Sequence, residues 1–132
     1  MAHVVFYDRP GGSGTSGQLA LLRRAGHDVE VRNTLTHPWT RDELLLFLGE
    51  VPVPDWIDRT SPRVRSGEVN PSNLSYGEAL SLLLADPGLL RRPLLEVGTR
   101  REVGFLVVVI DRWIGLDPAP PAEGLDDRRG HG

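Results

Sequence analysis

The first 33 residues alternate between apolar runs and a glycine-rich break in a way that restricts the fold strongly. Residues 4–7 are β-branched and aromatic, which is typical of a buried strand. A loop with one proline and four glycines follows at 9–17, and apolar residues at 19–25 then have helical spacing. Valines alternate with charged residues at 28–32, which indicates a second strand. Together these segments predict a βαβ unit with two parallel strands.

Two helix starts frame the middle of the chain. Thr40 and Glu43 have the spacing of a capping box, which begins a helix. Ser75 and Glu78 repeat that spacing further along. The proline-rich stretch 52–71 lies between the two predicted helices and is expected to be irregular. This part of the sequence therefore predicts a helical insertion.

The region after the insertion predicts an antiparallel hairpin and a last helix. Residues 94–97 and 100–105 are two strand-like runs that flank Gly98 and Thr99, a pair typical of a two-residue hairpin turn. Residues 106–116 are rich in β-branched side chains, but their apolar residues recur at helical spacing. We interpret this last segment as a helix.

The order of these elements defines a fold class and a domain boundary. A parallel βαβ half, a helical insertion and an antiparallel ββα half together give a thioredoxin-like α/β fold. We expect residues 1–116 to form this single domain. Residues 117–132 are dominated by proline, glycine and charged residues, so we expect them to form a disordered tail.

Composition excludes several kinds of chemistry. The chain contains no cysteine, and all 15 residues counted as lysine plus arginine are arginine. Disulfides, thiolate nucleophiles and lysine Schiff bases are therefore excluded. The net charge of −3 argues against a nucleic-acid partner, and no apolar run approaches the ~20 residues of a membrane span. We expect a cytoplasmic protein with neither a nucleic-acid nor a membrane partner.

The histidines and carboxylates do not form a recognisable metal or acid–base motif. The four histidines are scattered, with no pair spaced as ligands on one helix face. We interpret them as surface or capping residues and predict neither a metal nor a cofactor. They are His3, His27, His37 and His131.

The glycine loop matches a nucleotide-binding pattern only in part. Gly12, Gly14 and Gly17 fit G-x-G-x-x-G between a strand and a helix, as in dinucleotide-binding loops. However, four residues separate the strand from Gly12, and no acidic residue follows the second strand. Gln18 and Leu19 stand where a P-loop needs Lys and Ser or Thr. Two other interpretations stay open: a backbone cradle for an anion at a helix N-terminus, or a turn that simply needs glycine.

The same loop lies within a longer string that resembles a known family. Phe6-Tyr7-Asp8-Arg9-Pro10-Gly11-Gly12 is similar to the strand and active-site loop of the arsenate-reductase-like family, which includes the Spx regulators. There the loop reads aromatic-Tyr-x-Lys-Pro-x-Cys, and the cysteine attacks the oxyanion. The resemblance covers about residues 3–116. Three further strings resemble the nitrogenase-associated branch: Pro38-Trp39-Thr40, Arg91-Arg92-Pro93-Leu94 and Trp113-Ile114-Gly115-Leu116.

This resemblance implies a site that lacks its nucleophile. Gly12 stands at the position of the catalytic cysteine, so no catalytic residue is predicted. Ser13 beside it has no evident base to activate it. The resemblance further implies a cis peptide bond before Pro93 and an oxyanion-binding role for Arg92. We expect Gly12, Ser13, Gly14 and Arg92 to be the anion-binding candidates, with a solvated, vestigial Arg92 as the alternative.

Three functional hypotheses follow from the sequence. The first is a non-catalytic protein-interaction or regulatory module, nitrogenase-associated by resemblance, with a protein partner. The second is an oxyanion- or glutathione-binding, reductase-like enzyme that relies on an external thiol. The third is a dinucleotide-binding module that uses Gly12, Gly14 and Gly17.

Overall fold

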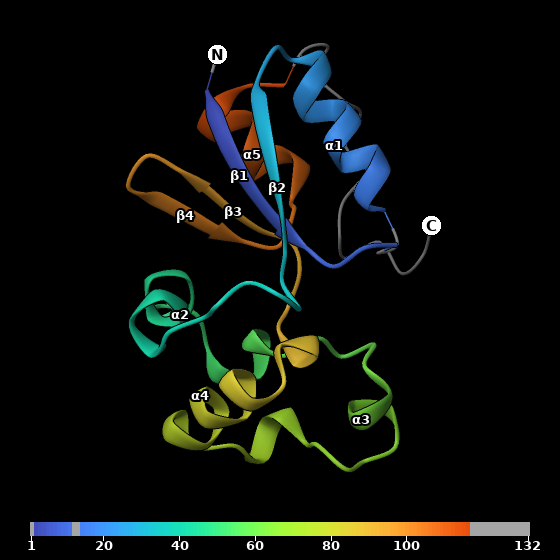
Figure 1. Cartoon of the computed structure of the whole chain (residues 1–132), viewed down its shortest axis with the longest axis vertical. Coiled ribbons are helices and arrows are strands. Elements are labelled where there is room, and N and C mark those ends of the chain that lie inside the picture. The colour runs from blue at the N-terminus through green and yellow to red at the C-terminus, as the bar shows by residue number, and fades with distance from the viewer. Residues whose placement is uncertain (1, 12–13, 117–132) are drawn as a thin grey trace.

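A four-stranded mixed sheet forms the centre of the fold (Figure 1). The structure is a computed structural model that describes residues 2–11 and 14–116. β2 is parallel to β1, whereas β3 is antiparallel to both β1 and β4. This topology confirms the predicted thioredoxin-like α/β fold, with one parallel and one antiparallel half. The strands are β1 (His3–Asp8), β2 (Asp28–Asn33), β3 (Leu94–Val97) and β4 (Arg100–Val103). Their spatial order in the sheet is β2-β1-β3-β4.

Both faces of β1 are covered, which explains its continuous run of apolar side chains. Successive residues of a strand point to opposite faces of the sheet. Val4 and Phe6 pack in one core with residues of α1 (Thr15–Arg24) and α5 (Val107–Ile114). Val5 and Tyr7 pack in a second core with the helical insertion. The end of β1 therefore lies between two buried layers.

The insertion between β2 and β3 is a set of short helices around a shared apolar core (Figure 1). Trp56 and Ile57 lie in this core and are at most 2% exposed. The proline-rich stretch predicted to be irregular contains three short helices, each with a proline in its first two positions. The insertion comprises α2 (Arg41–Leu48), η1 (Val53–Trp56), α3 (Pro62–Arg65), η2 (Pro71–Asn73), α4 (Tyr76–Ala85) and η3 (Pro87–Leu89).

The last strand ends earlier than the sequence predicts. β4 stops at Val103 because Gly104 has a φ of 83°, a left-handed conformation that turns the chain out of the sheet. Phe105 then enters the core and is fully buried. The helical interpretation of the following segment is confirmed by α5, in which Val107 and Ile110 are buried.

Of the two interpretations given for the histidines, a surface position is wrong for His27, whereas a capping role is confirmed at the end of α5. The backbone N–H of Ala2 donates to Nδ1 of His27 at 3.0 Å, and Nε2 lies 2.7 Å from the carbonyl oxygen of Gly115. Because Nδ1 accepts a hydrogen bond, the proton lies on Nε2, which donates to Gly115. The buried ring therefore ties the start of the sheet to the end of α5.

Parts of the sequence interpretation lie outside the described residues. These parts are the tail 117–132 with His131, and Gly12 and Ser13 of the glycine loop. Within residues 2–11 and 14–116, no three metal-ligating side chains gather into one group. No helix in that part of the chain has both the length and the apolarity that crossing a membrane requires.

The capping box at α4 gives a direct test of the local interpretation. Ser75 accepts from the backbone N–H of Glu78, and Glu78 accepts from that of Ser75. We expect Ser75→Ala to lower the free energy of unfolding by about 1 kcal/mol in urea denaturation, because a helix N–H loses its partner. Ser81→Ala, in the exposed middle of the same helix, is the control and is expected to cause no loss. Equal effects of the two substitutions would contradict the capping role.

Candidate functional site

The candidate site lies at the carboxyl end of β1, where Asp8 is the last residue of the strand. β1 pairs with β3 so that Tyr7 lies opposite Leu94. This register brings the residues just before β3 beside the end of β1. Arg92 stands there, and the peptide bond between Arg92 and Pro93 is cis.

The insertion contributes a second acidic residue, Asp58. Ile57 and Leu90 form an isolated antiparallel bridge, and the backbone N–H of Asp58 donates to the carbonyl of Leu89 at 2.8 Å. These backbone contacts hold the segment after η1 alongside the segment that leads to Arg92. As a result, Asp58 and Asp8 approach the same guanidinium from different parts of the chain.

Arg92 forms two ion pairs with these carboxylates. Its Nη1 donates to Oδ1 of Asp8 at 2.8 Å, and its Nη2 donates to Oδ2 of Asp58 at 3.3 Å. The three side chains are 13%, 3% and 9% exposed for Arg92, Asp8 and Asp58. Burial acts to lower the pKa of Arg92, but the two carboxylates outweigh burial and raise it. The guanidinium is therefore a largely covered cation whose charge is balanced by two carboxylates.

Asp8 is further bound by groups around the start of α1. Its Oδ1 also accepts from the backbone N–H of Arg9 at 2.8 Å, and its Oδ2 accepts from the hydroxyl of Thr15 at 2.6 Å. With Arg92, these donors give the carboxylate three hydrogen bonds. Asp8, a carboxylate of the chain itself, thus already accepts hydrogen bonds close to the N-terminus of α1.

Asp58 is stabilised in its charged form. Burial acts to raise its pKa, but the hydroxyl and backbone N–H of Thr60, at 2.6 and 2.9 Å, and the positive charge of Arg92 lower it below its usual value. Nη2 of Arg9 also lies 4.0 Å from Oδ2 of Asp58. Asp58 is therefore a charged, nearly buried bridge between the insertion and the sheet.

These four side chains balance one another in charge. Two carboxylates, Asp8 and Asp58, face two guanidiniums, Arg9 and Arg92. An exogenous anion would have to compete with carboxylates that are already in place and hydrogen-bonded. Within the described residues, one donor of the cluster, Nε of Arg92, is buried without a hydrogen-bond partner. The arrangement contains no thiol and holds three chain segments together.

The structure places only some of the anion-binding candidates from the sequence. Gly12 and Ser13 lie outside the described residues. Gly14 precedes α1 with a φ of 83° and supplies no side-chain cap. Gly17 lies within the first turn of α1. Arg92 lies beside β1, but it is neither solvated nor free, because both ends of its guanidinium are bound to carboxylates.

Sequence reasoning missed Asp8, Arg9, Thr15 and Asp58. One local signal was present, because Asp8 is an acidic residue directly after a buried strand and in front of a helix start. Such a residue must be hydrogen-bonded or paired when the strand end is covered on both sides. For Asp58, no comparable local signal exists in the proline-rich stretch.

Comparison with known proteins relates this chain to one family. The model of the ArsC family matches residues 29–110. A protein of Rhodospirillum rubrum described as an uncharacterized 15.7 kDa protein in the draG 3' region is 41% identical over 123 residues, which cover 93% of this chain and 86% of that protein. The global transcriptional regulator Spx of Streptococcus mutans is 35% identical over 83 residues, or 60% of this chain and 61% of Spx.

Solved structures show the same fold. An arsenate reductase from Vibrio cholerae superimposes with a TM-score of 0.66 at 24% identity, covering 78% of this chain and 90% of that one. An ArsC family related protein from Bacteroides fragilis gives a TM-score of 0.73 at 18% identity, covering 83% and 95%. At these identities the likeness concerns the fold alone.

A double-mutant cycle tests whether Arg92 and Asp8 act as one unit. We expect Asp8→Asn and Arg92→Met each to lower the free energy of unfolding by about 3 kcal/mol, because each leaves a buried charge without its partner. In urea denaturation, the double variant should lose less free energy of unfolding than the two single variants lose together. The difference should be about 1 kcal/mol or more. Arg41→Met removes an exposed arginine of α2 and is the matched control, with no expected loss. Strictly additive losses would refute the coupling.

The lowered pKa of Asp58 predicts a specific dependence of stability on pH. A carboxyl with a lowered pKa stabilises the fold fully above its unfolded pKa of about 4, and this contribution disappears as pH falls through the folded pKa. We expect wild type to exceed Asp58→Asn by about 2 kcal/mol in free energy of unfolding at neutral pH, and this difference to shrink as pH falls below the unfolded pKa and through the lower folded pKa. Urea denaturation across this range measures the difference.

Glu50→Gln, at an exposed position, serves as the control for this titration. It should leave stability nearly unchanged at every pH, because an exposed carboxylate gains little in the folded state. A constant difference between wild type and Asp58→Asn at all pH values would contradict the account.

Proposed function

The chain belongs to the ArsC family, and within this family we propose that it acts as a non-catalytic protein-interaction or regulatory module in the cytoplasm. The observation that carries this proposal is the pairing of Arg92 with Asp8 and Asp58 in a chain without cysteine. Thiol-dependent reduction needs a thiolate and a cation available to the oxyanion. The sequence contains no thiol, and two internal carboxylates occupy the guanidinium.

The competing proposal is a reductase-like enzyme that uses an external thiol. Such an enzyme would still have to bind its oxyanion near Arg92. The two carboxylates oppose this binding, since a second anion would face Asp8 and Asp58 at close range. The charge-balanced cluster therefore favours an interaction role over an enzymatic one.

The comparisons supply support for a regulatory role. The related Spx protein of Streptococcus mutans is described as a global transcriptional regulator. We infer that this chain also regulates through a partner protein, and we do not infer that the partner is the same. The strings that resemble nitrogenase-associated proteins, such as Trp113-Ile114-Gly115-Leu116, make a component of nitrogenase the first partner to examine.

Turnover measurements test the absence of catalysis. In an arsenate reductase assay with glutathione, glutaredoxin and NADPH, we expect wild type to match the rate without added protein, because the chain itself has no thiolate and Arg92 is paired with Asp8 and Asp58. Gly12→Cys alone is also expected to stay near this background, because Arg92 remains paired. The arsenate reductase of Vibrio cholerae is a suitable positive control.

Two outcomes would contradict the proposal. Turnover by wild type that scales with protein concentration and disappears in Arg92→Ala would support the external-thiol enzyme instead. Turnover by Gly12→Cys alone would show that the ion pairs leave Arg92 available to an oxyanion.

A binding measurement tests the partner. Purified nitrogenase component proteins, immobilised for biolayer interferometry, are expected to bind the chain with a Kd of about 10 μM or tighter, within the range of specific protein complexes. Heat-denatured chain is the control, since a folded interface should lose binding on denaturation. The absence of saturable binding to every component would refute nitrogenase as the partner while leaving the turnover result intact.

A further inference from the structure

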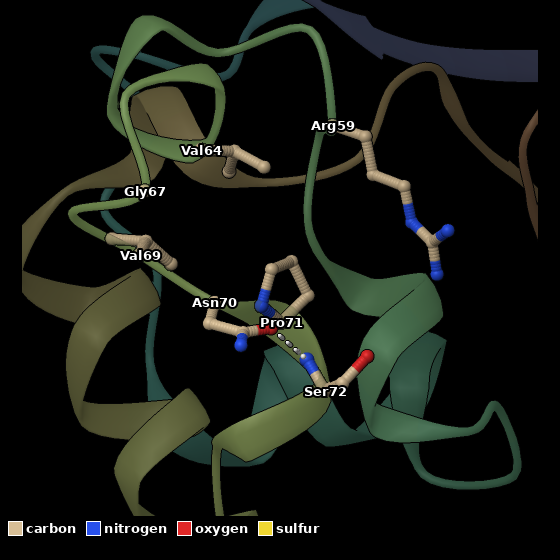
Figure 2. A pocket seen from close by; sticks show the side chains of 7 residues that line it. All are labelled: Arg59, Val64, Gly67, Val69, Asn70, Pro71 and Ser72. Atoms are coloured by element: carbon tan, nitrogen blue, oxygen red, sulfur yellow. Dashed lines mark hydrogen bonds between the residues drawn. The ribbon is translucent and has the colours of Figure 1, made fainter.

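A hollow in the insertion lies apart from the residues of the ion-pair cluster. Its volume is about 330 Å³, at the lower end of the range of ligand pockets. We call it the insertion hollow. Figure 2 shows Arg59 on one side, Val64 and Val69 on the other, and Pro71 between them. Its lining residues are Arg59, Val64, Gly67, Val69, Asn70, Pro71 and Ser72.

The wall opposite Arg59 is apolar and well fixed. Val69 and Pro71 are buried residues of the insertion. Asn70 accepts from the backbone N–H of Ser72 at 3.1 Å, which starts η2 and occupies the carbonyl end of the Asn70 side chain. An apolar side chain can therefore pack against this wall without a rearrangement of the wall's own backbone polar groups.

Arg59 is the only charged residue of the lining, and its charge is accessible. Its side chain is 63% exposed, and its contact with Asp55 is long, at 3.7 Å between two exposed groups. Arg63 nearby in sequence is different, because it binds Asp86 and Glu68 at 2.7 and 2.9 Å. The exposed pair of Arg59 and Asp55 contributes little free energy. Arg59 can therefore leave Asp55 and pair with another carboxylate at a low cost in free energy.

The position of Arg59 depends on the ion-pair cluster. Arg59 directly follows Asp58, whose carboxylate is held by Arg92 and Thr60. The start of the Arg59 side chain is therefore fixed, while its guanidinium stays in solvent. A fixed backbone with an exposed, weakly paired cation at the rim suits recognition of an extended partner segment.

We propose that the insertion hollow binds an acidic peptide segment of a partner protein, in which an apolar side chain stands next to a carboxylate. The apolar side chain packs between Val64, Val69 and Pro71, and the carboxylate pairs with Arg59. The volume holds one or two side chains and not a whole helix. This inference rests on the proposed interaction role and names the chemistry of the segment that the module recognises.

Peptide titrations of the isotope-labelled full chain test the inference. The probes are four capped tetrapeptides, acetyl-Gly-Xaa-Asp-Gly-amide, in which Xaa is Leu, Ile, Val or Phe. We expect at least one to shift the backbone NMR signals of residues 59, 64 and 67–72 with a Kd of about 1 mM or tighter. Replacing the Asp of the peptide by Asn should weaken binding about two- to fivefold, because the ion pair with the exposed Arg59 is lost and such a pair contributes little.

Two variants separate the hollow from general charge effects. Arg59→Ala should weaken binding of the acidic peptide about two- to fivefold and abolish the preference for Asp over Asn. Arg65→Ala removes an exposed arginine of the same insertion that does not line the hollow, so binding should stay unchanged. Equal losses in the two variants would overturn the proposal.

Other outcomes are equally decisive. If none of the four peptides shifts the hollow at about 5 mM, the peptide proposal fails. If 4-methylpentanoate binds there as tightly as the peptides, the hollow is a small-molecule site and the peptide proposal also fails. Neither outcome affects the turnover assay, so a failure here is distinguishable from a failure of the non-catalytic role.

Discussion

Arg92 joins three parts of the chain that are distant in sequence. Its guanidinium binds Asp8 at the end of β1 and Asp58 after η1, and its own backbone leads through a cis peptide bond into β3. Burying three charged groups is costly unless their geometry and hydrogen bonding are nearly complete. Donors from Arg9, Thr15 and Thr60 complete the hydrogen bonding of the two carboxylates, whereas Nε of Arg92 has no partner among the described residues. The sheet and the insertion are thus joined at one point by charge as well as by their apolar cores.

The same cluster has consequences for function. A cation that must hold two internal carboxylates to keep the fold intact is poorly placed to bind a substrate anion. The absence of cysteine from the sequence agrees with this, since a nucleophile without an anion site would serve no reductive purpose. The fold of the family is retained in a chain without cysteine. Both features agree with the interaction role proposed above.

The fold could be predicted because its signals are local. The hydroxyl of Thr40, which accepts from the backbone N–H of Glu43, and the full capping box at Ser75 fix two helix starts. The reciprocal half predicted for Glu43 does not form, because its carboxylate lies against His37. The continuous apolar run of β1 identifies a strand covered on both faces. The composition of the segment 106–116 fits either a strand or a helix, whereas the spacing of its apolar residues indicates the helix that the structure shows. The spacing is informative because these residues form the apolar face with which α5 packs against the sheet. The early end of β4 depends on Gly104, whose left-handed conformation no pattern of apolar residues reveals.

The state of the candidate site could not be predicted in the same way. Arg92 and Asp8 are separated by 84 positions, and nothing in the sequence around either residue specifies the other as its partner. Their pairing arises from the register of β1 with β3, which only the tertiary structure gives. The resemblance to a family therefore located Arg92 correctly near the strand end, but it could not show that the guanidinium is already bound.

The most direct test of this account is whether Arg92 binds an oxyanion in the intact protein. An NMR titration with arsenate can follow the Nε–H signal of Arg92, assigned with Arg92→Ala, with sodium chloride as the ionic-strength control. The account predicts no saturable change of this signal up to about 10 mM arsenate, because Asp8 and Asp58 keep the guanidinium. A saturable shift specific to arsenate would contradict it and would show that the anion site is open despite its internal carboxylates.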